Sequence, residues 1–357
     1  MCNKFHILFF CFFFSLFDIC AQSYFVNARS LRVKASTSLI LNSFNNKTIS
    51  CTSGVVNNDG TIICKKNWDN NSSDANNKVF TNANTTGTVE FKGTSLQSIG
   101  GTASTAFEIL KINNSAHVQV NRDIEVSSSL NFTSGVFRTL EYVLSLSESA
   151  SVTPTAGSST SFVDGKIKKN GNGSSFVFPV GNIQGSNVIW APLEMAAWNN
   201  TNDFTVGYAY KSPYDSLSFP TWNTGSNLDT GLHHVSGKEF WLIDRSGAGN
   251  QTPAVKLFWK NAVKSDIANT GSDYAAGALE SLRLVHWNTS TSKWENLGAS
   301  LSSCTWPSGS ISNTVNFTSY SPVTIGTKVS LNPLPVYFNG FSSLCNNSKT
   351  NLFWYSY

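Results

Sequence analysis

Few residues in this 357-residue chain have the types and spacing that catalysis requires. Only 13% of the residues are charged, and His233 and His234 are the only adjacent histidines. Neighbouring residues of an extended chain point to opposite sides, so this pair is a poor chelate and no metal site is predicted. Motifs of nucleophilic hydrolases, zinc proteases and phosphate-binding loops are missing. We therefore predict no catalytic residue and no cofactor, and a protein that is not an enzyme.

Carboxylates are the second group of candidates for catalysis, because polysaccharide-cleaving β-helices need two or three acids and a basic residue on one sheet face. Asp123 and Glu125 share one face of a predicted strand beside Arg122. The other acids of this region are widely spread. We interpret this small group as a solvated face rather than an active site.

Tryptophans are the best candidates for binding, because flat aromatic rings stack on sugar rings. Most of those in residues 171–328 are expected to be in a core, where large aromatic side chains contribute most to burial. Trp198 and Trp222 have polar neighbours and are predicted to be exposed. They form the predicted glycan platform.

Four cysteines follow the first 21 residues: Cys51, Cys64, Cys304 and Cys345. If Asn57 and Asn58 form a two-residue hairpin turn, Cys51 lies opposite Cys64, and a disulfide between them is predicted. A solenoid would instead place the two on stacked or neighbouring strands. Two free buried thiols are the other alternative.

The elements that must position these residues are short strands. Residues 49–170 contain brief apolar alternations separated by Asn, Gly, Ser and Thr, which predict many strands joined by tight turns. This pattern favours a β-solenoid or an extended β-ladder, and a sandwich with long loops has the same local signals. The repeats are too irregular to define a period. The preceding residues, 22–48, show no clear pattern and are treated as a lead-in segment.

A β-sandwich is predicted for residues 171–328, where aromatic residues become frequent. Its expected strands are 204–210, 240–243, 255–259, 282–287 and 315–317. Residues 329–357 combine a Pro-rich linker with two apolar strands, at 336–338 and 352–354. Together these regions predict an all-β chain.

The first 21 residues have the features of a secretory signal peptide. Lys4 precedes a nearly unbroken apolar run at 7–17, and small residues at Cys20 and Ala21 predict cleavage near Ala21. The run is too short to span a bilayer comfortably, so no transmembrane span is predicted in the mature chain. The net charge of +4 is scattered along the sequence, so nucleic acid is not an expected partner.

Four groups of segments, taken in order, carry a resemblance to a known class of protein. They are N-N-D-G-T-I at 57–62 with W-D-N-N at 68–71; F-V-D-G-K-I at 162–167 with F-P-V-G at 178–181; H-W-N at 286–288 and K-W-E-N-L-G at 293–298 with S-Y-S-P-V-T-I-G at 319–326; and P-L-P-V-Y-F at 333–338 followed by Cys345 and L-F-W at 352–354. In this order they resemble the surface proteins that gliding-type Gram-negative bacteria export through the type IX secretion system.

The resemblance implies that residues 333–357 begin an immunoglobulin-like module, which in those proteins is completed and followed by a C-terminal sorting domain. This sequence ends within the second strand of that module. We therefore expect a truncated chain that stays in the periplasm, whereas intact relatives reach the cell surface.

The function implied is that of a secreted or cell-surface, non-enzymatic structural or adhesin-like protein. The alternative is an extracellular module that binds or cleaves carbohydrate. Extracellular glycans or other cell-surface components are the expected partners.

Overall fold

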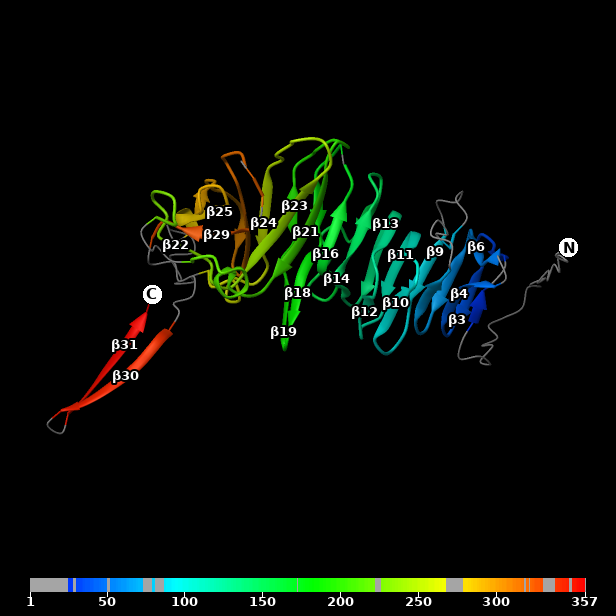
Figure 1. The fold of residues 1–357 in the computed structure, drawn as a ribbon, viewed down its shortest axis with the longest axis horizontal. Coiled ribbons are helices and arrows are strands. Elements are labelled where there is room, and N and C mark those ends of the chain that lie inside the picture. Colours follow the sequence, from blue (N-terminus) through cyan, green and yellow to red (C-terminus); the bar gives the residue numbers. More distant parts are fainter. Residues whose placement is uncertain are drawn as a thin grey trace.

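The computed structural model of the protein describes residues 25–27, 30–49, 52–72, 79–80, 87–171, 173–221, 226–267, 279–317, 319–320, 322–329, 338–346 and 349–356. Almost every element in these residues is a β-strand, so the predicted all-β fold is confirmed. The body is elongated: a narrow stack, blue to green in Figure 1, leads into a broader pair of sheets.

The narrow stack is a β-solenoid, which decides between the alternatives predicted for residues 49–170. Its strands pair in parallel with equivalent strands of the next coil and form three sheets, which we call faces 1, 2 and 3. Face 1 consists of β1 (Phe25–Asn27), β4 (Phe44–Ile49), β8 (Trp68–Asn71), β10 (Gln97–Gly101), β12 (Val118–Val120), the start of β14 (Phe137–Leu146), the start of β16 (Val163–Lys169) and β18 (Val180–Gln184).

The other two faces repeat the same parallel pairing. Face 2 consists of β2 (Ser30–Val33), β6 (Val55–Asn58), a single bridge at Phe80, the starts of β11 (Thr105–Asn113) and β13 (Ile124–Ser134), and the ends of β14 and β16. Face 3 consists of β3 (Ser38–Leu41), β7 (Thr61–Cys64), β9 (Thr88–Phe91), the ends of β11 and β13, and β15 (Ser151–Thr153).

The register of face 3 gives the length of each coil. The residues aligned from coil to coil are Ser38, Thr61, Thr88, Ile109, Ser129 and Ser151. Neighbours in this series are 23, 27, 21, 20 and 22 residues apart. Coils of unequal length explain why no period could be read from the sequence.

Apolar side chains fill the interior of the solenoid, because alternate residues of each strand point inward. On face 3 the inward column consists of Leu39, Ile62, Val89, Leu110, Leu130 and Val152. On face 1 the rings of Phe44 and Trp68 stack with centroids 4.0 Å apart. Each large apolar side chain removed from water contributes roughly 1.5–3 kcal/mol, so these columns are the main stabilising element.

Buried amide side chains join consecutive coils at the corners between faces. Asn70 Nδ2 donates to the Ser104 carbonyl at 2.6 Å, and Asn58 Nδ2 donates to the Thr88 carbonyl at 3.1 Å. At a third corner Gln97 Nε2 donates to the Cys64 carbonyl at 3.1 Å. These bonds tie each coil to the next and satisfy buried polar groups of the side chains, and the Cys64 carbonyl also accepts a backbone hydrogen bond from the Lys92 N–H at 2.9 Å.

Two sequence expectations about the start of the solenoid are wrong. Residues 22–48 are not a separate lead-in, because β3 and β4 pair with β7 and β8 and belong to the solenoid. The hairpin at Asn57-Asn58 does not form, because β6 pairs in parallel with β2 while β7 pairs with β3 and β9. The hairpin in this region joins β4 to β5 (Thr52–Ser53) instead.

A β-sandwich follows the solenoid, as predicted. Its first sheet continues face 2, because β16 pairs antiparallel with β21 (Asp203–Ala209), which leads to β23 (Phe240–Ser246), β29 (Val323–Thr327), β25 (Leu282–Asn288) and β26 (Lys293–Asn296), with β22 (His234–Val235) beside β29. Its second sheet consists of β17 (Phe176–Phe178), β20 (Leu193–Met195), β24 (Val255–Trp259), β28 (Ser308–Ser312) and β27 (Ser300–Thr305).

Smaller elements complete the described chain. β19 (Asn187–Trp190) forms a hairpin with β18, and the predicted strand at 315–317 is a loop. The predicted C-terminal strand pair is confirmed as the antiparallel hairpin of β30 (Phe338–Asn346) and β31 (Lys349–Ser356), a sheet of its own in Figure 1. The predicted strand at 352–354 lies within β31, whereas the one predicted at 336–338 overlaps β30 at Phe338 alone among the described residues. The helical segments of the described residues, α1 (Pro213–Leu217) and η1 (Leu279–Ser281), are both far too short to cross a bilayer.

We expect the Gly135→Ala substitution to destabilise the solenoid. Gly135 has a φ of +91°, and a Cβ added there would lie 1.8 Å from the Asn114 carbonyl oxygen of the preceding coil. The strain of a positive φ together with a displaced backbone should reduce the free energy of unfolding by at least about 2 kcal/mol. The midpoint of urea unfolding measures this change.

Gly231→Ala is the matched control. Gly231 also has a positive φ, +82°, but no atom lies within 4 Å of the added Cβ. Its substitution should therefore cost only about 1 kcal/mol, the penalty of the backbone conformation alone. Equal losses in the two variants would show that close contact between coils does not constrain this corner.

Candidate functional site

Trp198 is a core residue, so the prediction that it is exposed is wrong. Its side chain is 2% exposed, and its indole N–H donates to the Asn202 carbonyl at 3.1 Å. Its ring stacks on Phe178 and meets the edge of Phe204. The polar residues that follow Trp198 bond to one another; the Thr201 hydroxyl, for example, donates to Asn199 Oδ1 at 2.6 Å. Polar neighbours in the sequence are therefore compatible with a buried Trp198 ring.

Trp222, the other residue of the predicted glycan platform, lies outside the described residues. The same holds for Cys51. Cys64 is a free thiol inside the solenoid, where burial raises its pKa to about 12. Because the hairpin that would have placed Cys51 opposite Cys64 does not form, the geometric argument for that disulfide is wrong.

Two contacts of histidines with other ionisable side chains stand out in the described residues. His233 and His234 were expected to point apart, yet their Nδ1 atoms lie 2.8 Å from each other, because His233 precedes β22 and is not in an extended strand. His286 Nε2 lies 2.9 Å from Glu295 Oε2, and burial lowers the pKa of this imidazole. Within the described residues no group of three or more His, Cys, Asp or Glu side chains could hold a metal ion.

Asp123 and Glu125 connect coils of the solenoid. Asp123 Oδ1 accepts a hydrogen bond from the Val143 backbone N–H at 2.8 Å, and Glu125 Oε1 accepts one from the Ser147 hydroxyl at 3.3 Å. Arg122 Nε donates to the Gly101 carbonyl at 3.0 Å. Each of the three side chains is thus engaged with a neighbouring coil, and they do not converge on a common point.

Glu239 has the most perturbed carboxyl group of the sandwich. It is fully buried directly before β23, and its Oε2 accepts a hydrogen bond of 2.5 Å from the Tyr208 hydroxyl. Burial raises its pKa from 4.5 to about 7, against the lowering effect of hydrogen bonds from Tyr208 and Ser265. A carboxyl with this pKa could exchange a proton at neutral pH.

The surroundings of Glu239 close it off from solvent. Tyr208 and Ser265 are buried as well, and the Thr324 hydroxyl donates to the Glu239 carbonyl. Asp266 lies close enough to raise the pKa of Glu239 further, and Lys238 Nζ is 3.7 Å from Asp266 Oδ2. A carboxyl that no substrate can reach is a structural group, so we do not assign it to catalysis.

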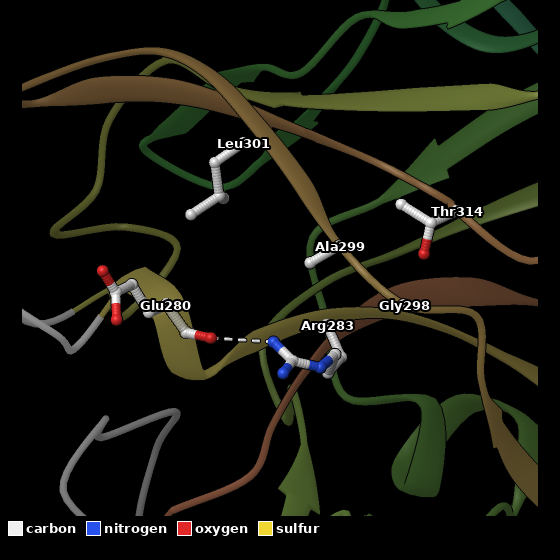
Figure 2. A pocket seen from close by; sticks show the side chains of 6 residues that line it. All are labelled: Glu280, Arg283, Gly298, Ala299, Leu301 and Thr314. Carbon is white, nitrogen blue, oxygen red and sulfur yellow. Dashed lines mark hydrogen bonds between the residues drawn. The ribbon is translucent and has the colours of Figure 1, made fainter.

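An open cavity of about 430 Å³ lies on the surface of the sandwich. It is lined by Glu280 of η1, Arg283 of β25, Leu301 of β27, and by Gly298, Ala299 and Thr314 from the connecting loops. Figure 2 shows Leu301 and Ala299 on one side of it and the Arg283 guanidinium on another. The Glu280 carboxylate points away from that guanidinium.

Arg283 is held in place by backbone carbonyls of η1 and of the start of β25. Its Nη1 donates to the Glu280 carbonyl at 2.8 Å and to the Leu282 carbonyl at 2.6 Å, the first of which is the dashed line in Figure 2. A guanidinium has five N–H donors, and these two bonds use only Nη1. Within the described residues the Nε and Nη2 N–H groups of Arg283 form no hydrogen bond with the protein.

No family model matches the chain, and neither a curated protein nor a solved structure matches it. The likeness to proteins exported by type IX secretion therefore rests on the four quoted groups of segments alone. It assigns no role to the residues of the cavity.

Sequence reasoning missed this cavity because its residues come from three separate segments, at 280–283, 298–301 and 314, and form no motif. One signal was present: Arg283 stands in an otherwise apolar run, Leu282 to Val285. In a strand that has one solvent-exposed face, a charged residue within an apolar run indicates the face that is exposed to solvent.

We expect Glu239→Gln to change how stability depends on pH. Because the folded-state pKa is raised, the protonated carboxyl is favoured in the fold, and its contribution is fully present below about pH 4.5 and lost as the pH rises through 7. The amide has the shape of the protonated acid and no charge. The variant should therefore gain about 3 kcal/mol relative to the parent between pH 5 and pH 9, measured by urea unfolding.

The control is Glu194→Gln, which removes a carboxylate paired with Lys256 Nζ at 2.8 Å on the outer side of the second sheet. Its difference from the parent should stay nearly constant over the same pH range. A constant difference for Glu239→Gln as well would mean that Glu239 is ionised in the fold at every pH tested.

Proposed function

We propose that this chain is a secreted or cell-surface protein with a structural or adhesin-like role and without enzymatic activity. The observation that carries this proposal is the continuity of face 2 with the first sheet of the sandwich, through β16 and β21. A sheet shared in this way makes the solenoid a rigid support for the sandwich. Rigid supports of this kind suit the display of a binding surface.

The outer side of the solenoid also supports a role in contact rather than chemistry. On face 3 the outward column consists of Ser38, Thr61, Thr88, Ile109, Ser129 and Ser151, five of which are hydroxyl residues. Short polar side chains on a parallel sheet give a regular surface of hydrogen-bonding groups. They offer no nucleophile with an activating base beside it.

Export is the first point to test. Residues 1–30 are fused to an alkaline phosphatase that is active only outside the cytoplasm, in a Gram-negative host. We expect active reporter and, by mass spectrometry, a mature product that starts at Gln22, because the apolar run at 7–17 has the length of a signal sequence.

The control fusion carries Phe13→Arg in the middle of that run. It should be inactive, since a charge in the apolar core of the segment prevents its insertion. An inactive parent fusion would contradict export. A parent fusion as active as expected but still uncut would show an anchored product instead of a secreted one.

The final location of the protein is tested separately by fractionation of a gliding-type bacterium that has type IX secretion. We expect the protein outside the cytoplasm, in the periplasmic, cell-surface or medium fraction. Recovery from the cytoplasmic fraction alone would contradict our proposal about its location.

A carbohydrate-binding module is the second candidate function, and the cavity beside Arg283 favours it.

The proposed lack of enzymatic activity is tested with a panel of polysaccharides. The purified mature chain, incubated with them, should release no reducing ends. Release that is lost on heat denaturation would overturn the non-enzymatic proposal.

A further inference from the structure

We infer that the cavity of Glu280, Arg283, Gly298, Ala299, Leu301 and Thr314 binds a sugar residue that carries a carboxylate. Its biological setting rests on the proposed adhesin-like function, while the binding itself follows from the residues. The volume of about 430 Å³ falls within the range of about 300–1,000 Å³ that small-molecule sites occupy.

The free edge of Arg283 selects the carboxylate. With Nη1 bonded to two carbonyls, the guanidinium cannot turn, and its Nε and Nη2 N–H groups remain as two parallel donors. This spacing matches the two oxygens of a carboxylate in a bidentate pair. Because the protein itself fixes the orientation, little side-chain entropy is lost when such a ligand binds.

The remaining lining suits the rest of a sugar ring. The Glu280 carboxylate accepts hydrogen bonds, and the Thr314 hydroxyl both donates and accepts them, as sugar hydroxyls require. Leu301 and Ala299 offer an apolar surface for the C–H face of the ring. Gly298 is required here, since a Cβ at this position would lie 1.9 Å from Thr314 Oγ1 and push that hydroxyl out of place.

The charges of the cavity distinguish this ligand from its competitors. A neutral sugar offers no charged partner to the donors of Arg283, and a small anion alone leaves Thr314 and the apolar surface of Leu301 and Ala299 uncovered. A free amino acid could pair its ammonium with Glu280 but has no ring to cover Leu301. A sugar acid matches each of these groups, and a polysaccharide chain can enter because the cavity is open.

Isothermal titration calorimetry of the mature chain with the trimer of galacturonic acid tests this inference. The neutral control ligand is the fully methyl-esterified trimer, which keeps the rings and loses the carboxylates. We expect saturable binding of the acid trimer and at least about 10-fold weaker binding of the ester, the loss expected from one charged bidentate pair.

Arg283→Ala should weaken binding of the acid trimer at least about 10-fold, and Arg283→Lys, which keeps the charge without the parallel donors, at least about threefold. The matched control is Arg245→Ala. Arg283 is half-buried and Arg245 is exposed. The Arg245 Nη1 likewise donates to a backbone carbonyl, that of Gln251 at 2.8 Å, but Arg245 is not part of the cavity. This variant should bind within about twofold of the parent.

Thermal unfolding of each variant separates loss of the site from loss of the fold. If Arg283→Ala lowers the melting temperature, Thr314→Val decides the matter, since it removes one ligand hydrogen bond and should weaken binding about threefold or more. Equal binding of acid and ester, unchanged binding by both variants, or tighter binding of free amino acids would overturn the inference. So would the absence of saturation at about 10 mM trimer. None of these outcomes affects the export test, which uses residues 1–30 alone.

Discussion

The structure depends above all on parallel hydrogen bonding in register between successive coils. Each strand of the solenoid satisfies its backbone groups through the coils above and below it, and equivalent residues are thereby stacked in columns. Register fixes which side chains point inward, so the apolar columns, the stacked rings of Phe44 and Trp68 and the amides at the corners all follow from it. Residues added between strands leave the columns unchanged, which is why coils of 20 and 27 residues coexist.

The junction between solenoid and sandwich covers the strand edge that the last coil of face 2 would otherwise leave unpaired. A parallel stack must end in an open edge, and unpaired strand edges invite association. Here β16 receives the antiparallel strand β21, with Ile167 opposite Val206. Lys169 lies in the inward column at this point, where its Nζ donates to the Ser147 carbonyl at 2.5 Å and faces the Phe176 ring. Burial lowers the pKa of this ammonium to about 8. The apolar column thus ends in a buried polar side chain whose Nζ is hydrogen-bonded to the backbone.

Local patterns predicted the strands and the fold class, because period-two alternation and turn residues are properties of neighbouring positions. They could not predict pairing. The sequence around Asn57 and Asn58 has the composition of a hairpin turn, and only the stacking of β6 on β2 rules it out. The same limit applies to sites. Trp198 has polar neighbours, but these bond to one another and the ring is buried. Arg283 and Thr314 line one cavity only because β25 lies in the first sheet of the sandwich and β28, which Thr314 follows, in the second, a relation that no local pattern contains.

The unequal coils have a consequence for how such a molecule can change its length. Neighbouring strands lie about 4.8 Å apart, so the six aligned strands of face 3 span about 24 Å. Duplicating or deleting one whole coil would move the sandwich by a single such step along the axis and would leave both ends of the rod chemically unaltered. The reach of the protein is therefore a quantity that gene rearrangement can adjust in discrete increments, independently of whatever the sandwich binds.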